Sequence, residues 1–190
     1  MMTDDDERLW KHVDHDCSRL VSLHVEINAP GWSAGSPEST RTVGKALNIA
    51  YAAAYRTVMD FAHSGRPWPP DKRSKYPVRE DGRREGKLAH PRDITSKELC
   101  GGPLADGWTP EEEKRHDDSD KLVAHLSKDR VEREGDEKQK RGEEDWDWGD
   151  ERDRVLWEDY VRRLVGEHGE HLPETAAALK RLDAMGQAGP

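Results

Sequence analysis

The chain has 190 residues, of which 37% are charged and 33% hydrophobic, and its formal net charge is −9. An average globular domain is about 45–50% apolar and about 25% charged. The chain therefore holds too little apolar material to be packed from end to end. We expect a single domain over residues 1–190 that includes long solvated segments.

The composition also bears on where the protein resides. No stretch approaches the roughly 18 apolar residues of a membrane span. The N-terminal sequence MMTDDDER is acidic where a secretory signal needs basic residues. Two cysteines, Cys17 and Cys100, make no disulfide framework. We therefore expect a cytoplasmic protein without a membrane partner.

The apolar residues recur at helical spacing, in four or five blocks, while alternating strand patterns are nearly absent. In chain order the blocks cover about residues 5–27, 39–63, 109–131, 146–168 and 173–185. Each predicted helix has one apolar stripe, which needs a partner. The sequence therefore predicts an all-α fold, a bundle of four to five helices.

Proline, glycine and capping residues mark the helix boundaries. Pro30 and Gly31 end the first predicted helix, and Gly65 with Pro67 ends the second. The segment Thr109-Pro110-Glu111-Glu112 begins the third, because Thr and Glu three positions apart form a capping box and Pro suits the first helical position.

Between the second and third helices, residues 65–107 are rich in proline and hold few apolar residues. We expect a long irregular loop or a partly disordered segment, since little burial offsets the cost of ordering it. A second, charged loop is predicted over residues 132–145. Basic residues of the longer loop are candidates for holding RNA or DNA: Lys72, Arg73, Lys75, Arg79, Arg83, Arg84, Lys87 and Arg92. The net charge favours a solvated loop instead.

Three tryptophans, Trp146, Trp148 and Trp157, lie near the start of the fourth predicted helix. Aromatic rings can stack on bases, but acidic residues such as Asp147 and Glu151 surround these rings and repel phosphate. Packing against the bundle, or against a partner surface, is the favoured interpretation.

Arg56 and His63 frame the segment RTVMDFAH on the second predicted helix. Helical geometry directs the two side chains within about 20° of each other and roughly 10 Å apart along the axis. An Arg that stabilises phosphate charge and a His that transfers a proton make a metal-independent RNA-cleaving pair. The separation calls for a long reach by Arg56 or for a second protomer. The same spacing recurs elsewhere, so spacing alone identifies no site.

Two further groups of histidines are candidates for catalysis or metal binding. His125 lies one helical turn from Lys121, and it is either a histidine at the edge of the core or an outside catalytic candidate. His12 and His15 are spaced to share a metal, near Cys17 and His24, but a structural zinc site needs four convergent ligands. We predict a buried cysteine and surface histidines here, with no metal and no cofactor.

Two segments, AYRTVMDFAH (54–63) and DKLVAHLSKDR (120–130), resemble actinobacterial helical proteins grouped as HEPN-like (higher eukaryotes and prokaryotes nucleotide-binding). In those proteins a "W-T-P" turn precedes the later segment, and here Trp108-Thr109-Pro110 stands upstream of His125. The similarity covers about a third of the chain. The family pattern has Asn, Asp or His directly after the Arg, and this chain has Thr57.

The resemblance implies a helical bundle that often dimerises, and an endoribonuclease of toxin–antitoxin or phage-defence systems. Arg56 would bind phosphate and His63 would act as general acid or base. RNA, a protein and a second copy of the chain are thus the expected partners. Some HEPN-like proteins are non-catalytic, so a helical protein-interaction module is the main alternative, and a metal-binding bundle is a weaker one.

Overall fold

The computed structural model describes residues 4–29, 36–90, 93–124 and 148–187. These residues form six helices and one two-stranded sheet, which confirms the all-α prediction. The helices are α1 (Asp4–Ile27), α2 (Pro37–Ala62), α3 (Ser96–Leu99), α4 (Pro110–Ala124), α6 (Glu151–His168) and α7 (Pro173–Gln187). No helix within the described ranges is long and apolar enough to cross a membrane.

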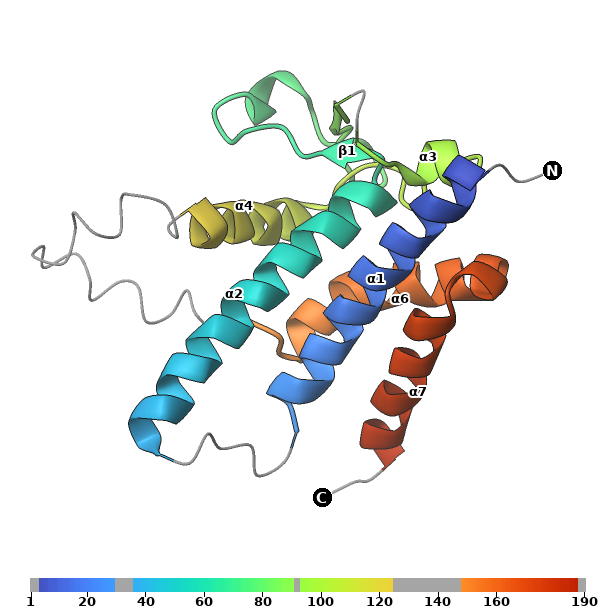
Figure 1. The fold of residues 1–190 in the computed structure, drawn as a ribbon. Helices are drawn as coiled ribbons and strands as arrows, with labels where there is room; N and C mark the ends of the chain where they lie inside the picture. Colours follow the sequence, from blue (N-terminus) through green and yellow to red (C-terminus); the bar gives the residue numbers. More distant parts are fainter. Residues whose placement is uncertain (1–3, 30–35, 91–92, 125–147, 188–190) are drawn as a thin grey trace, which may run out of the picture.

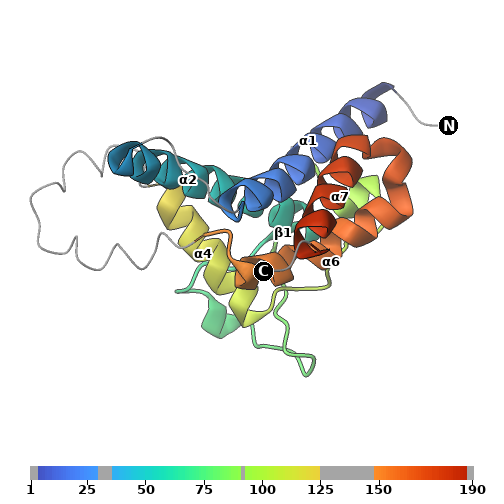
Figure 2. The same ribbon diagram turned by 90° about the horizontal axis from the view of Figure 1, so that it is seen from below.

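Helices α1 and α2 lie side by side, with α7 packed on α1 and α4 packed on α2 (Figure 1). Seen from below, α4 and α6 lie on one side of the α1–α2 pair (Figure 2). The core fills the space between these helices. Its most deeply buried side chains include Leu20, Val21, Tyr51, Tyr55, Met59, Trp157, Val161 and Leu164.

Side-chain caps fix where the helices begin. The predicted capping box of α4 is present: the backbone N–H of Thr109 donates to Glu112 (2.7 Å), and that of Glu112 donates to the Thr109 hydroxyl (3.2 Å). Ser36 caps α2. The cap of α7 comes from α1, because buried Asp14 accepts from the backbone N–H of Thr175 (2.8 Å). This contact fixes the rotation of α1 about its axis, and with it the residues that face α2.

The tryptophans pack inside the bundle where the structure describes them. Trp157 is fully buried and donates to the Tyr51 hydroxyl (2.7 Å). Trp148 is buried under the Arg115 guanidinium, 3.7 Å from the ring centroid. The packing prediction is confirmed for both residues. Trp146 and the predicted loop 132–145 lie outside the described residues.

After α2 the chain reverses into a short hairpin, in which β1 (Gly65–Arg66) pairs antiparallel with β2 (Lys87–Leu88). The two strands approach closely at Gly65, where a Cβ atom would stand 2.3 Å from the Lys87 carbonyl oxygen. A side chain at Gly65 would therefore separate the strands. The hairpin, the 3-10 turn η1 (Arg73–Lys75) and helix α3 lie within the predicted irregular loop.

Arginines hold this loop against the acidic face of α4. Arg84 donates to buried Glu113 (2.6 Å), and Arg73 donates to Asp117 (2.8 Å). Arg84 and Trp108 also exchange two backbone hydrogen bonds. Ion pairs with α4 therefore help to order this loop, although the loop has few apolar residues to bury. It also engages Arg73 and Arg84, which the sequence had offered as nucleic-acid contacts.

Candidate functional site

His63, the first catalytic candidate, lies in the core at the C-terminal end of α2. Its side chain is fully buried, and its ring stacks on Trp108 at 3.8 Å between centroids. Its Nε2 lies 3.7 Å from a carboxylate oxygen of Glu112. Burial lowers the pKa of His63, which holds the imidazole neutral near pH 7. A ring in this position is shielded from an external substrate.

Arg56, the second candidate, lies nearer the N-terminal end of α2 than His63 does, and it pairs with Asp120 of α4 (2.8 Å). Its side chain is 29% exposed. The structure therefore places Arg56 at the surface and His63 in the interior, and within one chain it does not bring them to a common surface. The third candidate, His125, lies outside the described residues.

The histidines of α1 separate in the same way. His12 and His15 are exposed and Cys17 is buried, as expected, but His24 is buried and is not a surface histidine. Among the residues that the structure describes, no three His, Cys, Asp or Glu side chains converge to hold a metal ion.

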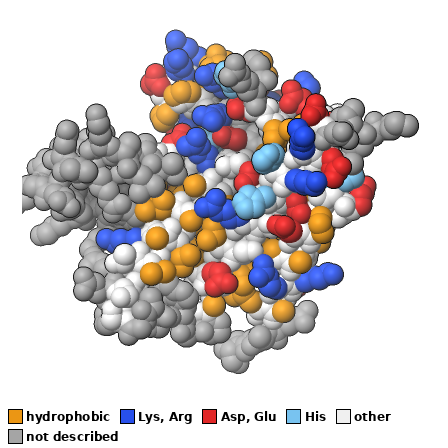
Figure 3. Space-filling model, viewed as in Figure 1, with side chains coloured by type: hydrophobic (Ala, Val, Ile, Leu, Met, Phe, Trp, Pro, Cys, Tyr) orange, Lys and Arg blue, Asp and Glu red, His pale blue; other side chains and the backbone are white. Residues whose placement is uncertain are grey.

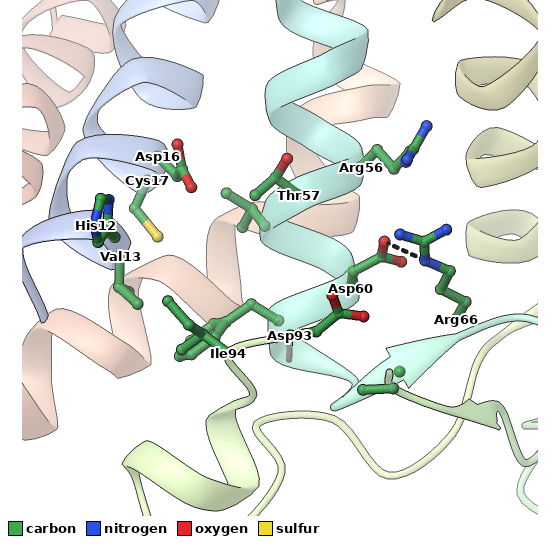
Figure 4. Close-up of a pocket in the computed structure, with 14 residues that line it drawn as sticks. His12, Val13, Asp16, Cys17, Arg56, Thr57, Asp60, Arg66, Asp93 and Ile94 are labelled. Carbon is green, nitrogen blue, oxygen red and sulfur yellow. Dashed lines mark ion pairs between the residues drawn. The ribbon is translucent and has the colours of Figure 1, made fainter. Parts of the chain in front are cut away.

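A pocket of about 310 Å³ opens between α1, α2 and the chain around the hairpin. Its apolar wall comes from both helices and from the segment before α3, and consists of Val13, Cys17, Val58, Phe61 and Ile94. Figure 4 shows the polar side chains around it, with Asp16 on α1 facing Thr57 on α2. Figure 3 shows charged and histidine side chains interspersed with apolar ones over this face of the molecule. The pocket thus combines an apolar wall with a charged rim.

A buried histidine of α4 supports the α2 side of the rim. His116 is 2% exposed, and its Nε2 lies 2.8 Å from one carboxylate oxygen of Asp60. The other oxygen of Asp60 pairs with Arg66 of β1 (3.1 Å). On the next turn Asp120 holds Arg56. Asp60, Arg56 and Arg66 are thereby held in place before any ligand arrives.

Sequence reasoning missed His116 and Asp60. Asp60 lies within RTVMDFAH, between the two catalytic candidates, and His116 lies within the acidic run of α4. His116 and Asp120 are one helical turn apart, a spacing that places them on one face and is visible in the sequence. The pairing with Asp60 spans 56 positions and has no local signal.

The pocket offers weak nucleophiles. Burial raises the pKa of the Cys17 thiol far above neutral pH, so the thiol stays protonated. The hydroxyl of Thr57 donates to the Ala53 carbonyl (3.1 Å). Neither group is activated by a base in the contacts that the structure describes. The arrangement therefore suits binding better than covalent chemistry.

Comparison with known proteins adds no family: no protein-family model, no curated protein and no solved structure matches this chain. The likeness to HEPN-like proteins thus rests on the short motifs alone.

The buried histidines predict a pH dependence of stability. Burial, with the charge of Arg154, lowers the pKa of His24 to about 4, and burial also lowers that of His63. Below about pH 6.5 the unfolded chain binds protons at these rings while the folded chain does not. The free energy of unfolding therefore falls as pH drops from 6.5, by roughly 3 kcal/mol at pH 4 for His24 alone.

Urea unfolding between pH 7.5 and 4 measures this dependence. The variant His24→Leu should lose a large part of the slope, because it has no ring to protonate. The matched control His15→Leu, at an exposed position of the same helix, should retain it. Equal slopes in wild type and His24→Leu would show that His24 is not held neutral.

Proposed function

We propose that this protein is a non-catalytic helical interaction module, and that the α1–α2 pocket is where its partner binds. The observation that carries the proposal is the pocket's lining: apolar side chains beneath a rim of Asp16, Asp60, Arg56 and Arg66. Binding sites characteristically combine an apolar wall with a few placed polar groups. A volume of about 310 Å³ lies at the small end of the range for ligand pockets.

The rigidity of the rim supports the same proposal. Asp60 is held from two sides, by His116 and by Arg66, and Arg56 is held by Asp120. Side chains that are already fixed lose little conformational freedom when a ligand binds. A pre-formed rim therefore favours recognition of one particular chemical group.

The surface continues beyond the pocket toward the hairpin. Arg66, Ala89 and Asp93 line both the pocket and a second hollow beside it. Leu88 lines the second hollow and is 85% exposed. An apolar side chain beside a charged rim is a feature of protein–protein contacts, so the ligand group is best supplied by a partner molecule that also covers Leu88.

Ribonuclease activity is the second candidate, and one observation favours it. Arg56, Arg66 and His12 all line the pocket, so cationic groups and an exposed imidazole share one cavity. The carboxylates of Asp16, Asp60 and Asp93 line it as well and repel a phosphodiester. HEPN-like kinship and a homodimer remain predictions from the motifs.

Filling the pocket tests the proposed function. Thr57 is exposed at the pocket, so Thr57→Trp should occupy the cavity without disturbing the core. A fragment screen followed by amide NMR shifts should give hits that perturb residues around the pocket in the wild type and lose that effect in Thr57→Trp. Thr42→Trp, at an exposed position of the same helix outside the pocket, is the control. If the fragments bind Thr57→Trp as they bind the wild type, the pocket is not the binding site.

Incubation with total RNA in EDTA tests the second candidate. The binding proposal predicts that RNA stays as intact with the wild type as with Arg56→Ala. Arg56 is the suitable variant because its side chain is partly exposed, whereas replacing buried His63 would disturb the core. Cleavage by the wild type that Arg56→Ala lacks would restore the ribonuclease hypothesis and overturn the non-catalytic assignment.

A further inference from the structure

The arginines of the pocket have ion-pair partners among the described residues, whereas two of its carboxylates do not. On the α4 side, both arginines have a carboxylate partner: Arg56 pairs with Asp120 and Arg66 with Asp60. Figure 4 shows Arg56 directed away from α1 and from Asp16. The cationic groups of the pocket are therefore already neutralised, and little positive charge remains for an anionic ligand.

Two carboxylates of the pocket, Asp16 on α1 and Asp93 shortly before α3, have no such ion-pair partner among the described residues. Half-buried Asp16 has no hydrogen-bond or ion-pair partner among the described residues. Asp93 accepts a hydrogen bond from the His90 backbone N–H (3.0 Å) but pairs with no cation in the described part of the chain. Within the described ranges, two carboxylates thus border the cavity without a cationic partner, and they come from separate parts of the chain.

The wall between these carboxylates is apolar. Val13, Val58 and Phe61 are each buried and line the cavity. The Cys17 thiol, 2% exposed, has no hydrogen-bond partner among the described residues and is directed toward this space (Figure 4). A ligand that satisfies both features carries a positive charge at the rim and an aliphatic body against the wall.

Resting on the proposed function, we infer that the pocket accepts an alkylammonium group, such as a lysine side chain or a free aliphatic amine. The ammonium ion meets the carboxylate of Asp16 and the methylene chain lies against Val13, Cys17 and Phe61. A divalent cation fits less well, because no three candidate ligands converge among the described residues and the wall is apolar. An anion would be repelled by the carboxylates of Asp16 and Asp93, for which the described part of the chain supplies no cationic partner.

NMR titration of the full chain with four probes tests this inference. Two probes are cations, n-butylamine and Nα-acetyl-lysine-N-methylamide, and they distinguish a free amine from a lysine side chain. The other two are controls of matched length, the uncharged Nα-acetyl-norleucine-N-methylamide and the anion valerate. We expect shifts at pocket residues with one or both cationic probes, and none with the uncharged or anionic probe at the same concentration.

The variant Asp16→Asn should lower the affinity for the cationic probe by at least roughly threefold, because it loses one partly exposed ion pair. Asp16→Glu should restore binding. Asp5→Asn, at an exposed position of the same helix outside the pocket, should leave it unchanged. Circular dichroism checks that each variant is folded.

The outcomes separate the two proposals. Equal binding of charged and uncharged probes, or an Asp16→Asn variant that binds the amine as well as the wild type, overturns the alkylammonium inference and leaves the pocket as a binding site. Binding of valerate in place of the amines does the same. If the fragments bind Thr57→Trp as they bind the wild type, and none of the four probes binds, both the proposed function and the alkylammonium inference are overturned.

Discussion

The buried polar face of α4 is the constraint on which the rest of this structure depends. Glu112, Glu113 and His116 are each at most 3% exposed, and a buried ionisable group is costly unless it is partnered. Their partners come from three places. Asp60 lies on α2 and His63 at its C-cap, Arg73 and Arg84 lie in the long loop, and Tyr160 lies on α6. One helix face thus joins elements that are far apart in the sequence. Removing both Arg73 and Arg84 would leave the buried carboxylate of Glu113 without these cationic partners.

The pocket is a consequence of that arrangement. His116 fixes Asp60, and Asp60 in turn fixes Arg66 on the first strand of the hairpin. The loop arginines bring the hairpin and the segment before α3 to the end of α2, where they close the pocket from one side. Asp14 sets the rotation of α1 and so presents His12, Asp16 and Cys17 on the other side. The pocket and the ordered loop therefore both depend on the same buried polar residues of α4.

The sequence predicted the features that depend on neighbouring residues. Apolar spacing gave the long helices, and the capping box at Thr109 and Glu112 gave the start of α4. The ordering of the loop could not be predicted, because Arg84 and Glu113 are 29 positions apart and many arginines in this chain stand near carboxylates. His63 illustrates the limit for the site: its spacing from Arg56 is the same whether the ring is exposed or stacked beneath Trp108. Whether the ring is exposed depends on Trp108, which is far from His63 in the sequence. Helical periodicity carries no information about such a contact.

Hydrogen exchange at the backbone of the loop tests the central claim most directly. The amides of Arg84 and Trp108 donate to each other's carbonyl oxygens (2.8 and 2.7 Å), and that of Ala105 donates to Ala62 (3.1 Å). If the α4 face holds the loop as part of the folded core, these three amides exchange at least roughly a thousandfold more slowly than in a free peptide and open together with α2. Exchange at free-peptide rates, with α2 still protected, would contradict the account.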